Sequence, residues 1–163
     1  MNTLFNVLHV VTAVFIVGPL AILPMTALRA LRTGSGAQVS TLATSTAVFG
    51  RLSIVVVILG FAVMGTSDPK YGTSVTTPWV LWSLILWLAA AVVSEAVVVP
   101  SMKKAARALS GSPDLTGAAG GAATAGTASV AQAATDFYGR IAAGSGIVSV
   151  LLVAVVVLMV WKP

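Results

Sequence analysis

Four long apolar runs constrain the fold of this chain more than any other feature. They occupy approximately residues 4–28, 50–66, 78–100 and 138–161. A helix needs about 20 apolar residues to cross a hydrocarbon core of about 30 Å. The second run is the shortest, so we expect part of the preceding segment to enter the headgroup layer. Because lipid offers no hydrogen bonds to the backbone, we predict an all-α membrane protein, one domain (1–163) of four transmembrane helices.

The composition agrees with a membrane protein. The chain has 163 residues, of which 58% are hydrophobic and only 8% are charged, with a mean hydropathy of +1.02. A soluble domain carries roughly 25% charged residues, so this chain has too little polar surface to cover a water-soluble globule. Cysteine is absent, which excludes disulfides, thiolate metal sites and cysteine nucleophiles.

The distribution of basic residues predicts the orientation in the membrane. Basic residues gather around the first-to-second and third-to-fourth connections and are sparse on the other side, which predicts cytoplasmic connections and two extracytoplasmic termini in a bacterial plasma membrane. They do not interleave with aromatic residues as in nucleic-acid modules, so no nucleic-acid partner is expected. The gathered residues are Arg29, Arg32, Arg51, Lys103, Lys104, Arg107 and Arg140, against Lys70 and Lys162. We expect Tyr71, Trp79, Trp82 and Trp161 to form an aromatic belt at the outer interface.

A short motif occurs twice. Residues 49–52 and 138–141 each read aromatic, glycine, arginine, branched aliphatic, and Thr46 and Thr135 precede the arginines by the same spacing. With the predicted orientation, this pattern indicates two helical hairpins that form a parallel repeat. A shared membrane-entry signal, or coincidence in a chain of low complexity, would produce the same pattern.

Small residues dominate the segment before the fourth run. Their abundance in residues 110–128 predicts a flexible cytoplasmic loop, with the fourth helix beginning near Ser129. Within that helix, small residues recur at a spacing that allows close helix contacts, either inside the bundle or with a partner subunit. These helix-packing residues are Gly139, Ala142, Ala143 and Gly146.

Glu95 is the only acidic residue inside an apolar run. A carboxylate at a helix centre costs about 2.5–3.5 kcal/mol on insertion scales, so it needs a partner. Arg51 and Arg140 enter the membrane from the same side, and we expect one of them to form a structural ion pair with Glu95. The functional alternative is a proton or ion site, although the sequence holds no second intramembrane acid for a relay.

His9 is the only histidine and lies in the outer part of the first run. Histidine is the usual axial ligand of haem, and Met64 or Met159 would supply a second ligand. The simpler interpretation is a hydrogen-bonded packing residue. Phosphate-binding loops, Ser-His-Asp sets, zinc-ligand spacings and paired carboxylates are missing from the sequence, so we expect neither catalytic residues nor a bound cofactor or metal, and no enzyme activity.

Several features resemble a known group of proteins. They are the opening Leu4-Phe5-Asn6-Val7-Leu8-His9, the proline-then-basic hairpin ends, Thr77-Pro78-Trp79 and Phe49-Gly50-Arg51. The chain resembles the small four-helix integral membrane proteins of high-GC actinobacteria, and it is similar to a broad family of predicted integral membrane proteins of unknown function. It also resembles an accessory (association-factor) subunit of the actinobacterial respiratory supercomplex, in which a cytochrome bc complex and a cytochrome oxidase associate. This resemblance implies a cofactor-free role in electron transport beside respiratory subunits.

The leading hypothesis is therefore a non-catalytic accessory subunit of a larger membrane complex, most plausibly respiratory, with other membrane subunits and the lipid bilayer as its partners. One alternative is a small haem- or copper-handling membrane protein that uses His9. Another is a transporter component that uses Glu95.

Overall fold

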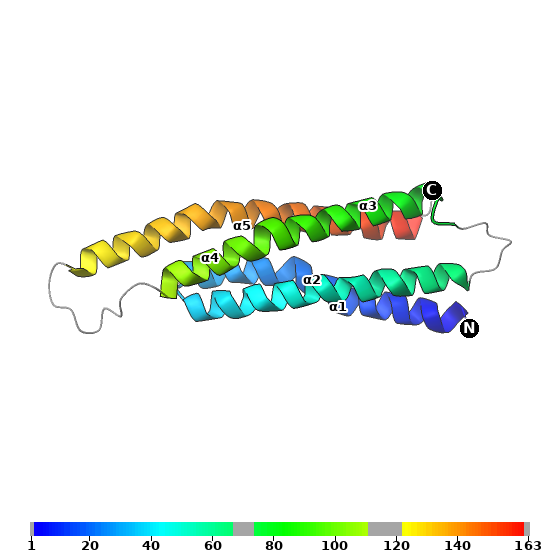
Figure 1. Ribbon diagram of the computed structural model, residues 1–163, viewed down its shortest axis with the longest axis horizontal. Coiled ribbons are helices and arrows are strands. Elements are labelled where there is room, and N and C mark those ends of the chain that lie inside the picture. The colour runs from blue at the N-terminus through cyan, green and yellow to red at the C-terminus, as the bar shows by residue number, and fades with distance from the viewer. Residues whose placement is uncertain (1, 67–73, 111–121, 162–163) are drawn as a thin grey trace.

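The computed structural model describes residues 2–66, 74–110 and 122–161, and every regular element in them is helical (Figure 1). The elements are α1 (Asn2–Arg32), α2 (Gly36–Gly65), α3 (Pro78–Val93), the π-helix η2 (Ser94–Val98), α4 (Val99–Ser110) and α5 (Ala122–Trp161). The predicted all-α membrane fold is confirmed. Four segments are long and apolar enough to span a bilayer: Thr3–Arg32, Gly36–Gly65, Pro78–Ser110 and Thr135–Trp161.

The helices form two antiparallel hairpins that run in the same direction. One hairpin is α1 with α2, and the other pairs the α3–η2–α4 rod with α5, so that Asn2 and Trp161 lie at one end of the bundle (Figure 1). A tight turn joins α1 to α2 through Gly34, whose φ of 72° favours glycine. The Gly34 N–H donates to the Leu31 carbonyl, which satisfies part of the helix end. The internal repeat itself stays a prediction.

The helices extend beyond the predicted spans. Helix α2 already begins at Gly36, and α5 begins at Ala122 rather than near Ser129. The prediction of a flexible loop over 110–128 is therefore wrong for Ser110 and for residues 122–128, which are helical, while 111–121 lie outside the described residues. Alanine loses no side-chain entropy in a helix, and extending an existing helix is far easier than nucleating one, so an alanine-rich flank continues the span.

The extra length projects from one side of the membrane. A 30-residue helix is about 45 Å long, which exceeds a hydrocarbon core of about 30 Å. Helix α4 has the pattern of a segment outside lipid, because Met102 and Ala105 are buried while Lys103 and Arg107 are exposed. The projecting end is therefore the basic end, opposite the chain termini.

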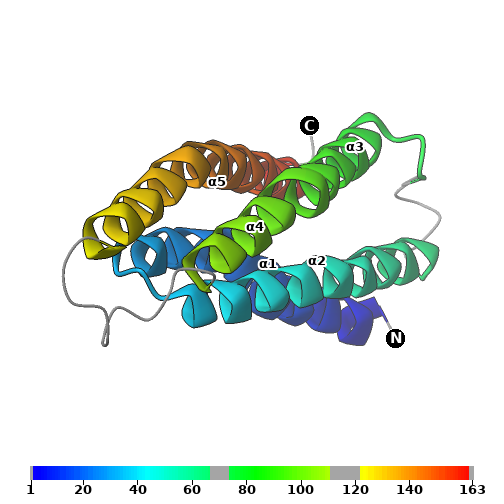
Figure 2. The same ribbon diagram turned by 60° about the vertical axis from the view of Figure 1, so that its left-hand side comes forward.

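The buried core is concentrated toward that basic end. On α1 no described side chain before Leu20 is buried, whereas Ala27 and Leu31 are almost fully covered. On α2 the last buried side chain is Val56, and on α5 it is Leu152. Figures 1 and 2 show the two hairpins close together at the basic end and farther apart at the end with the termini. The bundle is held together by its basic end and the adjoining part of the spans.

Two glycines on α5 offer a matched test of this packing. A Cβ added at Gly144 would lie 2.9 Å from Val98 Cγ2, whereas one added at Gly146 would meet nothing within 4 Å. Valine is stiff about χ1, so we expect Gly144→Ala to lower the free energy of unfolding by about 1–3 kcal/mol. Gly146→Ala should be neutral or stabilising by about 0.4–1 kcal/mol. Thermal unfolding of both variants in one detergent checks this, and equal stabilities would contradict the close approach of η2 and α5.

Candidate functional site

Glu95 lies in η2 and faces α2 inside the membrane. Its Oε1 atom is 3.9 Å from Arg51 Nε, and the exposed fractions of the two side chains are 39% and 73%. Arg51 is about 20 Å from the end of α2 at Gly65, from a rise of about 1.5 Å per residue. The pair therefore lies deep in the leaflet on the side of the basic end. Charge attraction at this depth is only weakly screened.

The helix that carries Glu95 is widened at this point. The Val99 N–H donates to the Ser94 carbonyl, five residues back, which defines a π-turn. One residue later comes Pro100, which lacks an N–H and whose ring excludes the carbonyl four residues before it. The third apolar run ends at Pro100, but the helix does not: the widened turn accommodates the proline and the helix continues to Ser110. Such π-bulges occur frequently at functional sites.

Small and polar side chains surround the Glu95 carboxylate. A Cβ added at Gly50 would lie 3.2 Å from Glu95 Oε1, so the glycine leaves room for the carboxylate. One turn along α2, the Ser53 hydroxyl donates to the Gly50 carbonyl at 2.6 Å and accepts a hydrogen bond from Trp87 Nε1 at 3.2 Å. The glycine of the first motif copy thus lies against the acid, while its arginine carries the opposite charge.

A small cavity adjoins these groups at the centre of the bundle. Its volume is about 20 Å³, and it is lined by all four spans. Glu95 Oε1 is buried and has no hydrogen-bond partner among the described residues. An unpaired buried carboxylate oxygen is costly, so this atom marks an incomplete polar site. The lining residues are Leu20, Gly50, Ser53, Trp87, Ala90, Ala91, Ser94, Glu95, Val148 and Leu152.

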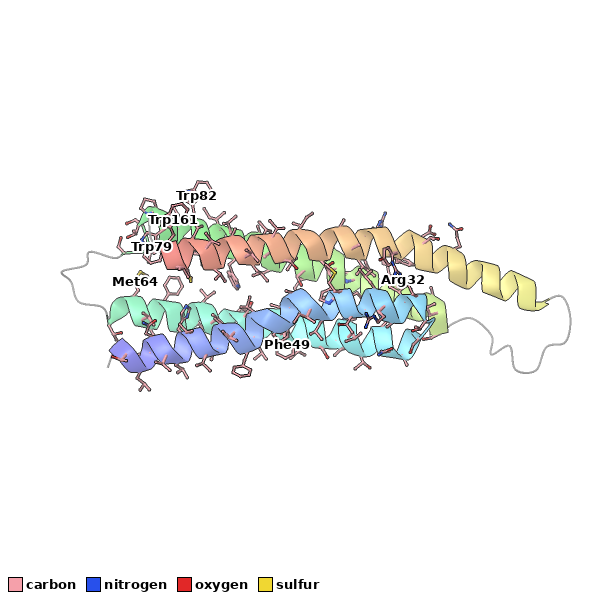
Figure 3. The ribbon with its side chains drawn as sticks, turned by 180° about the vertical axis from the view of Figure 1, so that it is seen from behind. Arg32, Phe49, Met64, Trp79, Trp82 and Trp161 are labelled. Carbon is pink, nitrogen blue, oxygen red and sulfur yellow. The ribbon has the colours of Figure 1, made fainter. Side chains whose placement is uncertain are left out.

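Arg140, the second predicted partner, is exposed and forms no ion pair within the described residues. Two residues before Arg140, Tyr138 contacts another arginine, Arg32. Arg32 Nη2 donates to the Tyr138 hydroxyl at 2.6 Å, and Arg32 Cζ lies 5.0 Å from the ring centroid. A guanidinium at this distance from an aromatic ring makes a favourable cation–π contact. Figure 3 shows Arg32 where α1 meets α5. This contact was not predicted from the sequence, although Tyr138 is the aromatic residue of the second motif copy.

His9 is held by α2. Its Nδ1 atom lies 2.9 Å from the Val56 carbonyl, and a Cβ added at Gly60 would lie 3.2 Å from its Cε1. Because a carbonyl only accepts, Nδ1 carries the proton and Nε2 keeps its lone pair. Met64 and Trp79 point into the space between the hairpins (Figure 3), and Met159 is 38% exposed on α5. The described residues contain no group of three His, Asp or Glu side chains that would hold a metal ion.

Three of the four residues predicted for an aromatic belt are described in the structure, and the belt itself stays a prediction. Trp82 and Trp161 are 57% and 77% exposed, and Trp79 is half-buried. Figure 3 shows the three indoles gathered at the end of the bundle that carries the termini. Tyr71 lies outside the described residues.

The small residues predicted for helix packing divide between two faces of α5. Ala142 packs against the buried core, while Ala143 is exposed and Gly139 and Gly146 have open space beside them. Inside the bundle, α5 approaches η2 closely at Gly144, a residue that was not predicted from the sequence. The 139–143–146 face therefore points away from the bundle.

A larger hollow, of about 370 Å³, lies on the outer face of α2 near the basic end. Two of its hydroxyls already donate to their own helix, from Thr41 to Ala37 and from Thr44 to Ser40. No titratable group lines it, so we assign it no chemistry. Its lining residues are Ser40, Thr41, Thr44, Ser45, Val48 and Phe49.

The Trp87–Ser53 hydrogen bond can be tested by a double-mutant cycle. We expect Ser53→Ala to destabilise the bundle by about 1–3 kcal/mol, because the Trp87 indole N–H loses its acceptor in a half-buried position. Adding Ser53→Ala to Trp87→Phe should cost less, because the donor is then absent. Unfolding free energies from denaturing-detergent titrations check this, and strictly additive costs would show that the two side chains are not coupled.

Comparison with known proteins gives one match. The model of a family described as predicted integral membrane protein (DUF2269) matches residues 3–163. No curated protein and no solved structure matches the chain. Since the match covers nearly the whole sequence, and four apolar helices are long enough to span a bilayer, this chain belongs to the DUF2269 family of integral membrane proteins.

Proposed function

We propose that this protein is a non-catalytic accessory subunit of a larger membrane complex, and that it binds its partner through the outer face of α5. The finer form of the proposal is a respiratory supercomplex of a cytochrome bc complex and a cytochrome oxidase in a bacterial plasma membrane. We place the basic end of the bundle at the cytoplasmic face of this membrane, near anionic headgroups or acidic loops of the partner.

The proposal rests on one stripe of residues along α5. Its members are spaced alternately by four and three residues, which is the spacing of a helix–helix seam. The stripe begins with small residues and continues with exposed valines, so that a partner helix approaches closely at one end and meets a stiff apolar ridge at the other. Its members are Gly139, Ala143, Gly146, Val150, Val153, Val157 and Val160.

The geometry favours a protein partner on this face over lipid alone. Cβ atoms added at Gly139 and Gly146 would meet nothing within 4 Å, so the helix backbone is bare at both positions. Between helices in a membrane, association depends on van der Waals packing, and bare backbone permits the closest approach. The valines keep one preferred rotamer in a helix and lose little entropy on contact.

The test is co-purification in mild detergent from the native membrane, comparing the wild type with the Gly139→Leu, Gly146→Leu double variant. We expect the wild type to retain partner chains, with cytochromes among them, and the double variant to lose at least about 90% of them because the leucines hold the partner helix away. Gly18→Leu is the matched control, since Gly18 on α1 also has open space beside it. A wild type that purifies alone, or a double variant that keeps its partners, contradicts the proposal.

His9 supports a second candidate function, a small haem- or copper-handling membrane protein. A ligating histidine ordinarily donates its other ring N–H to a carbonyl, and the Nδ1 contact with the Val56 carbonyl has this form. We expect protein purified from haem-replete cells to show a haem absorption band that His9→Ala abolishes and His9→Gln strongly reduces. A spectrum without haem bands, together with the absence of copper by elemental analysis, removes this candidate.

A further inference from the structure

We propose that Glu95 is a proton-binding site inside the membrane, and that one water molecule in the adjoining cavity completes its neutral form. This inference goes beyond the accessory role and does not depend on it. It rests on the orphaned Glu95 Oε1, the cavity beside it and the single cation opposite it.

In its ionised form, Glu95 has an opposite charge nearby, but its Oε1 atom accepts no hydrogen bond from the described residues. Arg51 supplies opposite charge, but its Nε atom is 3.9 Å from Oε1, which is beyond hydrogen-bond distance. The other spans that line the cavity contribute no charge: Leu20 comes from α1, Trp87 from α3 and Val148 from α5. Among the described residues, Arg51 is thus the one charged group that balances the carboxylate.

The cavity has the size for one water. Its volume of about 20 Å³ exceeds the roughly 10–15 Å³ that one water molecule requires. A buried water needs two to four polar partners, and the residues that line the space include Glu95, Ser53 and Ser94. After proton uptake the carboxyl O–H donates to this water, which in turn donates to a serine hydroxyl.

A metal cation fits the same site poorly. Calcium takes six to eight oxygen ligands, whereas one carboxyl group and two hydroxyls line this cavity. A guanidinium beside the carboxylate also occupies the position that a cation would take. The proton is the ligand that needs neither further oxygens nor removal of Arg51.

Proton uptake changes the surroundings of Arg51. The neutral carboxyl no longer holds the guanidinium, and the Arg51 side chain is already 73% exposed. A long basic side chain inside a membrane extends toward the nearer headgroups, so the free guanidinium is expected to reorient toward the headgroups at the basic end. The pair thus has two arrangements, and the proton selects between them.

A hydrophobic carbodiimide tests the site, because it enters lipid and reacts with protonated carboxyl groups. The carboxyl proton passes to a carbodiimide nitrogen while the carboxyl oxygen adds to the central carbon, and the adduct rearranges to a stable acylurea. We expect mass spectrometry of the full chain in phospholipid nanodiscs to find the adduct on Glu95, with a labelling rate that falls severalfold from mildly acidic to alkaline buffer. Arg51→Gln should raise the rate severalfold, because the ionised form loses its counter-charge.

The controls separate this site from a carboxyl that is merely accessible. Asp136 is exposed on the projecting part of α5 and should react with a water-soluble carbodiimide that leaves Glu95 unlabelled. Glu95→Gln should abolish the hydrophobic adduct, and Glu95→Asp provides a carboxyl variant should the glutamine variant fail to fold. Labelling of Asp136 alone, labelling of Glu95 that is independent of pH, or an unchanged rate in Arg51→Gln overturns the proposal.

Discussion

The structure depends on one constraint, that lipid satisfies no polar group. The backbone meets this constraint by forming helices almost without interruption. One irregular turn is η2, where Pro100 lacks an N–H and the chain widens to a five-residue hydrogen bond from Val99 to Ser94. Glu95, the acidic residue that lies inside an apolar run, is carried by this widened turn, so the backbone irregularity and the polar site share one location.

Packing is uneven along the bundle, and this unevenness follows from the solvent at each level. At the basic end the helices project into water, so burial of Met102, Ala105 and Leu31 is driven by the hydrophobic effect. Near the termini the helices lie in hydrocarbon, which solvates apolar side chains as well as a protein neighbour does. There the two hairpins separate (Figures 1 and 2), while α1 and α2 stay in contact within the first hairpin, as where His9 lies against Gly60.

The fold class was predictable because the apolar runs and their length leave few alternatives in a membrane. Helix ends were less predictable, since the flank before Ile141 carries no stop signal and alanine continues the helix outside lipid. The π-turn was not predicted, because a proline at this position is typical of a helix end. In the structure the helix instead widens over the residues before Pro100 and continues. Charge and depth predicted that Glu95 would pair with Arg51 or Arg140. Which arginine pairs, the position of Gly50 against the carboxylate and the Arg32–Tyr138 contact all depend on helix rotation, which a low-complexity sequence does not specify.

The two copies of the aromatic–glycine–arginine motif occupy different surroundings. Gly50 faces inward and makes room for a carboxylate, whereas Gly139 faces outward with open space beside it. The residues that follow diverge in the same way, because Leu52 is exposed and Ile141 is fully buried. Glycine suits both positions for one reason, that it lets another group approach the backbone. The first copy therefore packs against a group of the same chain, the Glu95 carboxylate on η2, which is the proposed proton site. The second copy is left open to a group from another chain, and it begins the proposed partner surface on α5.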